Sequence, residues 1–282
     1  MPEPVLYESH SHTPLCKHAV GDPEVYAAQA LERGLKGLIV TCHNPMPDGF
    51  SSSVRMLPEQ FDDYLALVEH ARVAFAGRLD VCLGIEADYF EGYEPWLEQQ
   101  LAATDFQYVL GSVHPQLGEY RKRYGNVDPI VEYRTYFDNL AKSAETRLFD
   151  CLAHPDLIKN VAPNAWDPDV IMDDVRRALD RISVTGVAME LNTSGLYKRI
   201  EEMNPFPAML VEMKERGIRV VLGADAHTPY RVADDYELGL DLLIECGFSE
   251  VHVFKGRKAK AIDIHVARAS LIPLHSAPGA SA

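Results

Sequence analysis

Short apolar runs alternate along the chain with longer stretches in which apolar residues recur at helical spacing, and this alternation continues to residue 254. Near-continuous apolar runs of this length are typical of strands buried on both faces, as in a parallel sheet covered by helices. The pattern therefore predicts repeated βα units. We expect strands at Val5–Ser9, Gly37–Thr41, Asp80–Ile85, Tyr108–Gly111, Phe149–Ala153, Val187–Leu191, Arg219–Gly223 and Glu250–Phe254.

The stretches between these runs are predicted to be helices, and several open with proline, which suits the first helical turn. They are Pro23–Arg33, Pro58–Phe75, Tyr93–Ala102, Pro129–Thr146, Pro168–Ile182, Pro205–Glu215 and Arg231–Cys246. Seven or eight such units without a linker favour one closed barrel. An open doubly wound sheet is the alternative, but no glycine-rich dinucleotide or phosphate-loop motif follows any predicted strand. We expect residues 1–270 to form the barrel and residues 271–282 to form a flexible tail.

Composition and charge narrow the class of partner. The 282 residues carry 27 Lys and Arg against 42 Asp and Glu, a formal net charge of −15. Such an acidic chain is poorly suited to nucleic acid, which requires clustered basic side chains. The five cysteines form no C-x-x-C pair, and no apolar run approaches the ~20 residues needed to cross a bilayer. We expect a cytoplasmic protein without a membrane partner, and its oligomeric state stays open.

Residues that can bind metal ions follow most of the predicted strands. The strand ends supply His10, His12, His18, His43, Glu86, His114, His154, Asn192, Asp225 and His227. Because the active sites of α/β barrels are built from the C-terminal ends of the strands, we expect these side chains to meet at one rim. Imidazole and carboxylate together suit zinc, iron or manganese. The absence of C-x-x-C spacing favours an open catalytic site over a closed structural zinc site.

The short segments around these residues resemble the ordered motifs of the polymerase and histidinol phosphatase (PHP) superfamily, and most closely those of its histidinol-phosphate phosphatases. They are His10–Thr13, Leu15–Ala19, Thr41–Pro45, Gly84–Tyr89, Gly111–His114, Ala153–Asp156, Glu190–Gly195 and Gly223–His227. The resemblance runs from residue 5 to about residue 260. It implies a distorted (β/α)7 barrel of the TIM-like, PHP type, with a trinuclear centre of divalent zinc, iron or manganese ions at its C-terminal rim.

The resemblance also implies the ligand sets of that centre. One ion is expected on His10, His12, Glu86 and Asp225, a second on His18, His43 and His227, and a third on Glu86, His114 and His154. Glu86, Asp225 and His227 are assigned a catalytic role as well. Three divalent ions with two ligating carboxylates give a formal local charge of about +4, so an anionic substrate can bind to an acidic protein.

The implied activity is that of a histidinol-phosphatase, which releases phosphate from L-histidinol phosphate in histidine biosynthesis. We hypothesise that metal-bound hydroxide attacks phosphorus. Lys17, Lys198 and Arg199 are the candidates for binding the phosphate group of a small phosphorylated metabolite. The sequence identifies no general acid for the leaving group.

Two departures from the resemblance affect the substrate. Tyr197 stands where the histidinol-phosphate phosphatases commonly have arginine, and the loop Pro115–Tyr124 is more basic than expected. An acidic group such as Asp88 or Glu119 could face the substrate amine.

Other functions are alternatives at this point. They are hydrolysis of another phosphate ester, a metal-dependent amidohydrolase, and a non-enzymatic metal store. A cysteine phosphatase built on Cys42 is disfavoured, since no arginine closes a short loop behind that residue.

Overall fold

The computed structural model describes residues 3–273 and contains a nine-stranded sheet whose strands follow one another in sequence order. Neighbouring strands from β1 to β8 are parallel, whereas β8 and β9 form an antiparallel hairpin. The strands are β1 (Tyr7–Ser11), β2 (Gly37–Val40), β3 (Asp80–Asp88), β4 (Tyr108–Ser112), β5 (Cys151–Leu152), β6 (Ala188–Asn192), β7 (Val220–Gly223), β8 (Glu250–Lys255) and β9 (Lys258–Asp263). All eight strands predicted from the apolar runs are present, with ends shifted by a few residues.

The first seven strands curl until β1 meets the segment that follows β7, at a contact that we call the seam. Ser11 and Ala226 form a parallel bridge there. The His12 amide donates to the Ala226 carbonyl at 3.0 Å, and the Ala226 amide donates to the His10 carbonyl at 2.9 Å. No continuous β1–β7 ladder is found among the described strands. The expected distorted seven-stranded barrel is thus confirmed, and β8 and β9 extend beyond it.

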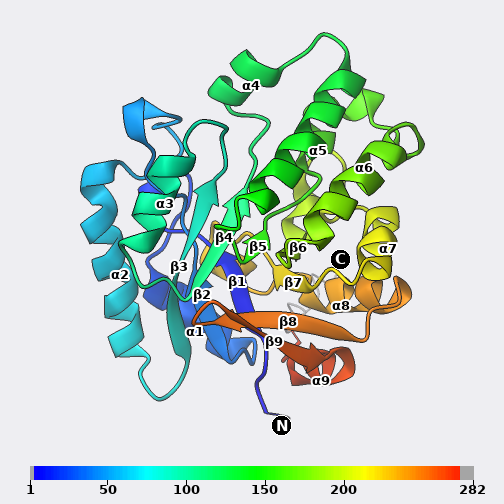
Figure 1. Cartoon of the computed structure of the whole chain (residues 1–282). Coiled ribbons are helices and arrows are strands. Elements are labelled where there is room, and N and C mark those ends of the chain that lie inside the picture. Colours follow the sequence, from blue (N-terminus) through cyan, green and yellow to red (C-terminus); the bar gives the residue numbers. More distant parts are fainter. Residues whose placement is uncertain (1–2, 274–282) are drawn as a thin grey trace, which may run out of the picture.

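Helices follow the strands and cover the outside of the barrel, with α2 and α3 on one side and α5 and α6 on the other in Figure 1. They are α1 (Pro23–Glu32), α2 (Phe61–Ala74), α3 (Glu94–Ala102), α4 (Gly118–Tyr124), α5 (Pro129–Glu145), α6 (Pro168–Ser183), α7 (Pro207–Glu215), α8 (Tyr236–Glu245) and α9 (Ile264–Ser270). In α6 the side chain of Asp167 accepts the Asp169 amide, and proline follows at the first helical position. The buried residues of α6 recur at helical spacing, and the helix packs against its neighbours α5 and α7.

Three described elements were not predicted: α4, β9 and α9. In α4 only Tyr120 is buried, so this helix has no apolar face to reveal it. Strand β9 is an edge strand in which only Ile262 is buried. Most of the predicted C-terminal tail, residues 274–282, lies outside the described residues.

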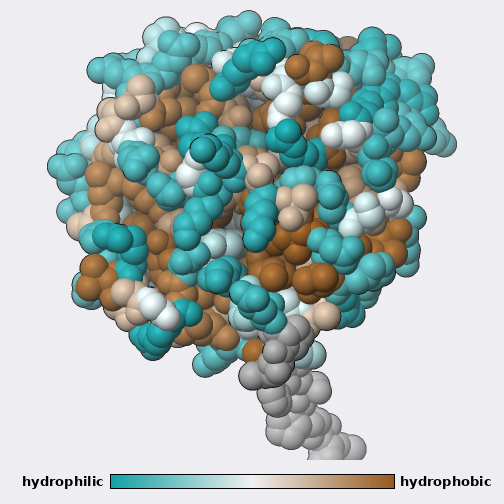
Figure 2. Space-filling view, turned by 60° about the horizontal axis from the view of Figure 1, so that its bottom comes forward, coloured by the Kyte–Doolittle hydropathy of each residue, from teal (hydrophilic) through white to brown (hydrophobic). Residues whose placement is uncertain are grey.

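At the opposite end of the barrel, the described residues contain no group of His, Cys, Asp or Glu donors close enough together to hold a metal ion. The bottom of the molecule in Figure 1, brought forward in Figure 2, shows hydrophilic and hydrophobic residues intermingled. A hollow of about 890 Å³ lies there, lined by residues such as Lys36 and Asp80 that precede or begin strands. Within residues 3–273, no helix has the length and apolar character needed to cross a membrane.

Substituting Gly111 in β4 tests how tightly the barrel wall packs. A Cβ at this position would lie 2.4 Å from Cγ of the buried Phe149 ring. We expect Gly111→Ala to lower the free energy of unfolding by about 1–3 kcal/mol, the usual range for overpacking a core. Gly118→Ala is the matched control, because no heavy atom lies within 4 Å of its Cβ, and it should change stability by less than about 0.5 kcal/mol. Equal denaturation midpoints for the two variants would contradict this packing argument.

Candidate metal centre

Glu86 lies at the middle of a cluster of histidines at the carboxyl ends of the strands. Its side chain is completely buried, and five imidazoles surround it. The distances from its carboxylate oxygens are 2.8 Å to His43 Nδ1, 3.2 Å to His154 Nε2, 3.4 Å to His114 Nε2, 3.5 Å to His10 Nε2 and 3.6 Å to His12 Nε2. The five imidazoles come from the ends of four strands, β1, β2, β4 and β5, and converge on the carboxylate that β3 carries.

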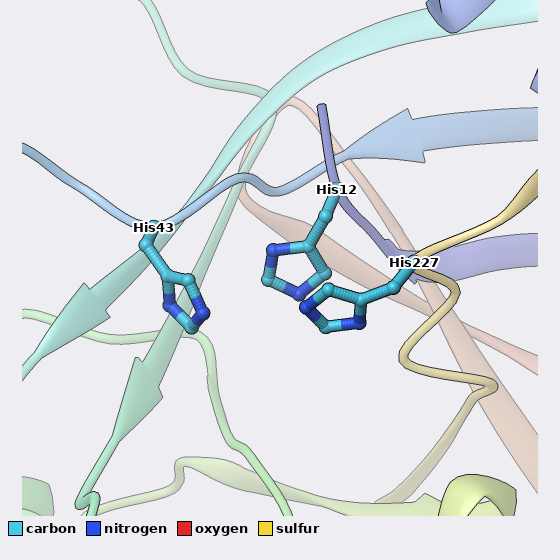
Figure 3. A group of neighbouring side chains, drawn as sticks. All are labelled: His12, His43 and His227. Atoms are coloured by element: carbon cyan, nitrogen blue, oxygen red, sulfur yellow. The ribbon is translucent and has the colours of Figure 1, made fainter. Parts of the chain in front are cut away.

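The remaining predicted residues lie beside this cluster. Asp225 Oδ1 is 3.3 Å from His12 Nε2 and 3.6 Å from His10 Nε2. His227 Nε2 is 2.9 Å from His18 Nε2, and the His12 and His227 rings stack with centroids 3.9 Å apart. Figure 3 shows His12, His43 and His227 reaching into the same space from three different segments. The structure therefore brings all nine predicted metal-binding residues together.

The backbone is strained at two of these positions. His154 and Asp225 have φ angles of 29° and 50°, in a region that residues other than glycine adopt rarely. Such strain costs about 1–3 kcal/mol per residue and tends to be retained at functional sites. At both positions the unusual φ belongs to a residue of the cluster that lies two residues after the end of its strand.

Hydrogen bonds at Nδ1 fix the orientation of four of the imidazoles. His10 Nδ1 pairs with Glu190 Oε1 at 2.8 Å, and His114 Nδ1 pairs with Asp88 Oδ1. His18 Nδ1 faces the Cys16 carbonyl at 2.7 Å, and His227 Nδ1 faces the Asp225 carbonyl at 3.0 Å. Because a bond at one ring nitrogen sets the tautomer, Nε2 of each ring points away from these partners and can bind a cation.

Glycine at position 223 makes room for one of these hydrogen bonds. A Cβ there would lie 1.9 Å from Glu190 Oε1 and 2.9 Å from the Cβ of His10. Only a residue without a side chain lets the Glu190 carboxylate reach His10 beside β7.

The two carboxylates are held in their ionised form. Burial raises the pKa of Glu86, but His43, His10 and His114 outweigh burial and hold it well below its usual value. Burial likewise raises the pKa of Asp225, and Lys198 and the nearby histidines outweigh it, so this pKa is also well below its usual value.

The imidazoles respond in opposite directions to the same cluster. Burial lowers the pKa of His10, but Glu190, Asp225 and Glu86 together raise it to about 10. Burial dominates at His43 and lowers its pKa to about 3. The cluster therefore draws positive charge toward the carboxylates while some of its rings stay neutral.

Several buried polar atoms fit a metal ion better than they fit the protein alone. In the described residues, His10 Nε2, both ring nitrogens of His12 and Glu86 Oε2 have no hydrogen-bond partner. The donor atoms of His10, His12 and Glu86 lie within 4.8 Å of one another, as do those of His43, Glu86 and His114. Unpaired buried imidazole and carboxylate donors at this spacing match the preferences of divalent transition ions.

The predicted phosphate-binding residues are placed differently from one another. A hollow of about 510 Å³ is lined by ring atoms of the cluster and by Lys198, whose Nζ donates to Ser194 Oγ at 2.6 Å and lies 3.2 Å from Asp225 Oδ2. Arg199 lines the adjoining hollow. Lys17 lines neither of these two hollows, and its Nζ donates to the Ser52 carbonyl.

Asp88 and Glu119, the acidic groups suggested to face a substrate amine, line neither of these two hollows. Asp88 is buried and bound to Arg55, Ser112 and His114. Glu119 accepts hydrogen bonds from the amide and hydroxyl of Ser51. Both carboxylates are already engaged within the protein.

Other residues of the site were missed by sequence reasoning. Arg231 and Tyr230 line the hollow, and the Arg231 guanidinium stacks on Tyr197 with 3.7 Å from Cζ to the ring centroid. Glu190 and Asp88, which orient histidines, were also not assigned this role. The sequence did contain a signal for them. Each lies two residues from another candidate residue of the same strand, and residues two apart on a strand point to the same face.

Comparison with known proteins places this geometry among related chains. The family model described as PHP domain matches residues 8–194. A Deinococcus radiodurans protein named "Probable histidinol-phosphatase" is 41% identical over 240 residues, 81% of this chain and 90% of that protein. The Bacillus subtilis protein named "Histidinol-phosphatase" is 25% identical over 83% of this chain and 98% of its own.

A solved structure agrees in fold. The crystal structure of histidinol phosphate phosphatase from Lactococcus lactis, complexed with zinc, L-histidinol and phosphate, superposes with a TM-score of 0.77 at 18% identity. The match covers 90% of this chain and 98% of that one.

The central position of Glu86 yields a test of the metal site. We expect Glu86→Gln to lower the affinity for divalent ions by about 100-fold or more, since changes merely adjacent to ligands commonly cost 10–100-fold. Elemental analysis after dialysis measures the bound metal. Glu98→Gln, at an exposed position of α3, is the matched control and should retain it. Equal metal content in the two variants would remove Glu86 from the site.

Proposed function

This chain belongs to the PHP domain family, and from that premise we propose that it is a metal-dependent phosphomonoesterase that hydrolyses histidinol phosphate to histidinol and phosphate. The observation that carries the proposal is the convergence of seven imidazoles and two carboxylates at the carboxyl ends of the strands. Five of these rings and Asp225 line one hollow. The names of the relatives support the choice of substrate. The site and the names of the relatives both fit an enzyme that acts in histidine biosynthesis.

The geometry supports a centre of three ions. His10, His12, Glu86 and Asp225 would hold the first, His18, His43 and His227 the second, and Glu86, His114 and His154 the third. Each set has short donor contacts, including 3.3 Å between His12 and Asp225, 2.9 Å between His18 and His227, and 3.2 Å between His154 and Glu86. When bound, such ions supply Lewis acidity at the phosphoryl oxygens and activate water for attack on phosphorus. Glu86 belongs to two of the sets and couples them.

The protein side chains have separate tasks in this proposal. Glu190 and Asp88 hold His10 and His114 with Nε2 toward the hollow, so these rings need not reorient when substrate arrives. Ser194 and Asp225 hold the Lys198 ammonium at the edge of the cluster. From there Lys198 can donate hydrogen bonds to the phosphoryl oxygens, which a fixed cation does more effectively than a mobile one.

Basic residues at the adjoining hollow extend this anion-binding surface. Arg121 and Arg199 line it together with Lys198. Tyr197 stands where the histidinol-phosphate phosphatases commonly have arginine, but other cations lie nearby. Among them is Arg231, whose guanidinium stacks on the Tyr197 ring. These residues support recognition of a phosphate ester, although Lys17 lies away from both hollows.

Removal and return of metal tests the proposed activity. Phosphate release from L-histidinol phosphate should disappear after dialysis against a chelator and return when zinc, manganese or ferrous iron is added back singly. The stoichiometry is read from elemental analysis of the same sample, with three ions per chain expected. Turnover that persists in the fully stripped protein would contradict a metal-dependent mechanism, and restored metal without phosphate release would contradict the choice of substrate.

Substituting the lysines tests the assignment of the phosphate contacts. Losing a hydrogen bond to a charged group costs about 1.5–3 kcal/mol, so Lys198→Ala should lower kcat/KM roughly tenfold to 150-fold. Lys17→Ala is the matched comparison, because its ammonium binds the Ser52 carbonyl, and it should leave kcat/KM within about twofold. A larger loss in Lys17→Ala than in Lys198→Ala would reverse the assignment.

A further inference from the structure

Cys16 lies inside the cluster of histidines although the ligand sets described above leave it out. It ends the short turn Pro14–Cys16 and is completely buried. Its Sγ and ring nitrogens of His18 and His227 all lie within 4.8 Å of one another. His12, whose ring nitrogens have no hydrogen-bond partner among the described residues, lies within the same distance of Cys16 Sγ.

The local backbone explains why two residues in the segment Cys16–His18 face the same site. Lys17 adopts a left-handed conformation with φ of 70°, and its amide donates to the Pro14 carbonyl at 2.9 Å. The chain therefore reverses at Lys17 and brings the His18 ring back, so that His18 Nδ1 is 2.7 Å from the Cys16 carbonyl. The turn thus leaves Cys16 Sγ and a ring nitrogen of His18 within 4.8 Å of each other.

We propose that Cys16 Sγ is a further ligand of the second ion, the one assigned above to His18, His43 and His227. This makes the position a mixed thiolate and imidazole site. The inference rests on the metal centre proposed above, but not on which phosphate ester it hydrolyses.

The spacing of the donors suits zinc. At a tetrahedral zinc ion with Zn–N of about 2.0 Å and Zn–S of about 2.3 Å, neighbouring donors are roughly 3.3–3.5 Å apart. The two Nε2 atoms are 2.9 Å apart, and Sγ lies within 4.8 Å of its partners. The two Nε2 atoms are thus slightly closer than the tetrahedral spacing, and Sγ lies no more than about 1.5 Å beyond it.

The neighbouring Cys42 is a weaker candidate. Its Sγ accepts a hydrogen bond from Thr13 Oγ1 at 3.2 Å and contacts the Thr13 carbonyl at 3.7 Å. Cys42 Sγ lies within 4.8 Å of possible ligand atoms of His12 and Cys16. Among the described residues it forms no such group with His18 and His227. Cys42 thus provides a buried thiol beside the same cluster that is expected not to bind the ion.

A thiolate ligand has a consequence for the choice of metal. Soft sulfur donors favour zinc and cobalt over manganese, which prefers oxygen ligands. The His18–His227 position should therefore prefer zinc, while the carboxylate-rich position at Glu86 and Asp225 accepts a wider range of ions.

Cobalt binding tests the assignment with a spectroscopic readout that does not depend on turnover. The full chain is stripped of metal, kept reduced with a phosphine, and titrated with Co²⁺. We expect a near-ultraviolet sulfur-to-cobalt charge-transfer band in the wild type, complete loss of this band in Cys16→Ser, and its retention in Cys42→Ser and Cys246→Ser. A band that survives in Cys16→Ser, or that disappears in Cys42→Ser, overturns the proposal.

A second measurement covers the case in which Cys16→Ser does not fold. X-ray absorption of the zinc-loaded wild type should contain a sulfur shell at about 2.3 Å, and a shell of nitrogen and oxygen alone overturns the proposal. The failures are distinguishable: bound cobalt without sulfur contradicts only the role of Cys16, whereas a chain that binds no cobalt contradicts the metal centre as well.

Discussion

A single carboxylate buried among five imidazoles is the constraint on which the site depends. Glu86 has no exposed surface, and every contact that stabilises its charge must come from the protein or from a bound cation. The surrounding rings supply part of that charge, and they can do so only because the strands bring His10, His43 and His154 to the same height. The charge of Glu86 is therefore stabilised only when the strands are arranged as they are in the barrel.

A set of buried carboxylates on the same strands supports the histidines. Glu8, Asp88 and Glu190 are each two residues from a site residue on their strand and are almost completely buried. Glu8 accepts the amides of His10, Ala224 and Ala233 and so ties the two sides of the seam together. Asp88 joins Arg55 to His114, and Glu190 joins His10 to the backbone of His154. The rings are positioned by these carboxylates rather than by their own backbone alone.

The apolar runs were sufficient to predict the eight strands, and the residues that end them were sufficient to predict the cluster, since parallel strands deliver their carboxyl ends to one rim. What the sequence could not show depends on contacts between distant segments. Nothing near Asp88 indicates that Arg55 will pair with it, and nothing near Lys17 indicates that its left-handed backbone directs the ammonium to Ser52. Helix α4 and strand β9 lack an apolar pattern because they lie at the surface and bury few side chains.

A metal ion bound next to the seam would also stabilise the closed form of the barrel. The barrel closes there through a few backbone bonds around Ser11 and Ala226, and the donors on either flank, His10 and His12 on one and Asp225 and His227 on the other, face each other across the join. An ion bound by donors from both flanks would hold the first and last strands of the barrel together. The metal occupancy of the site and the stability of the closed barrel would then both increase with the concentration of the metal.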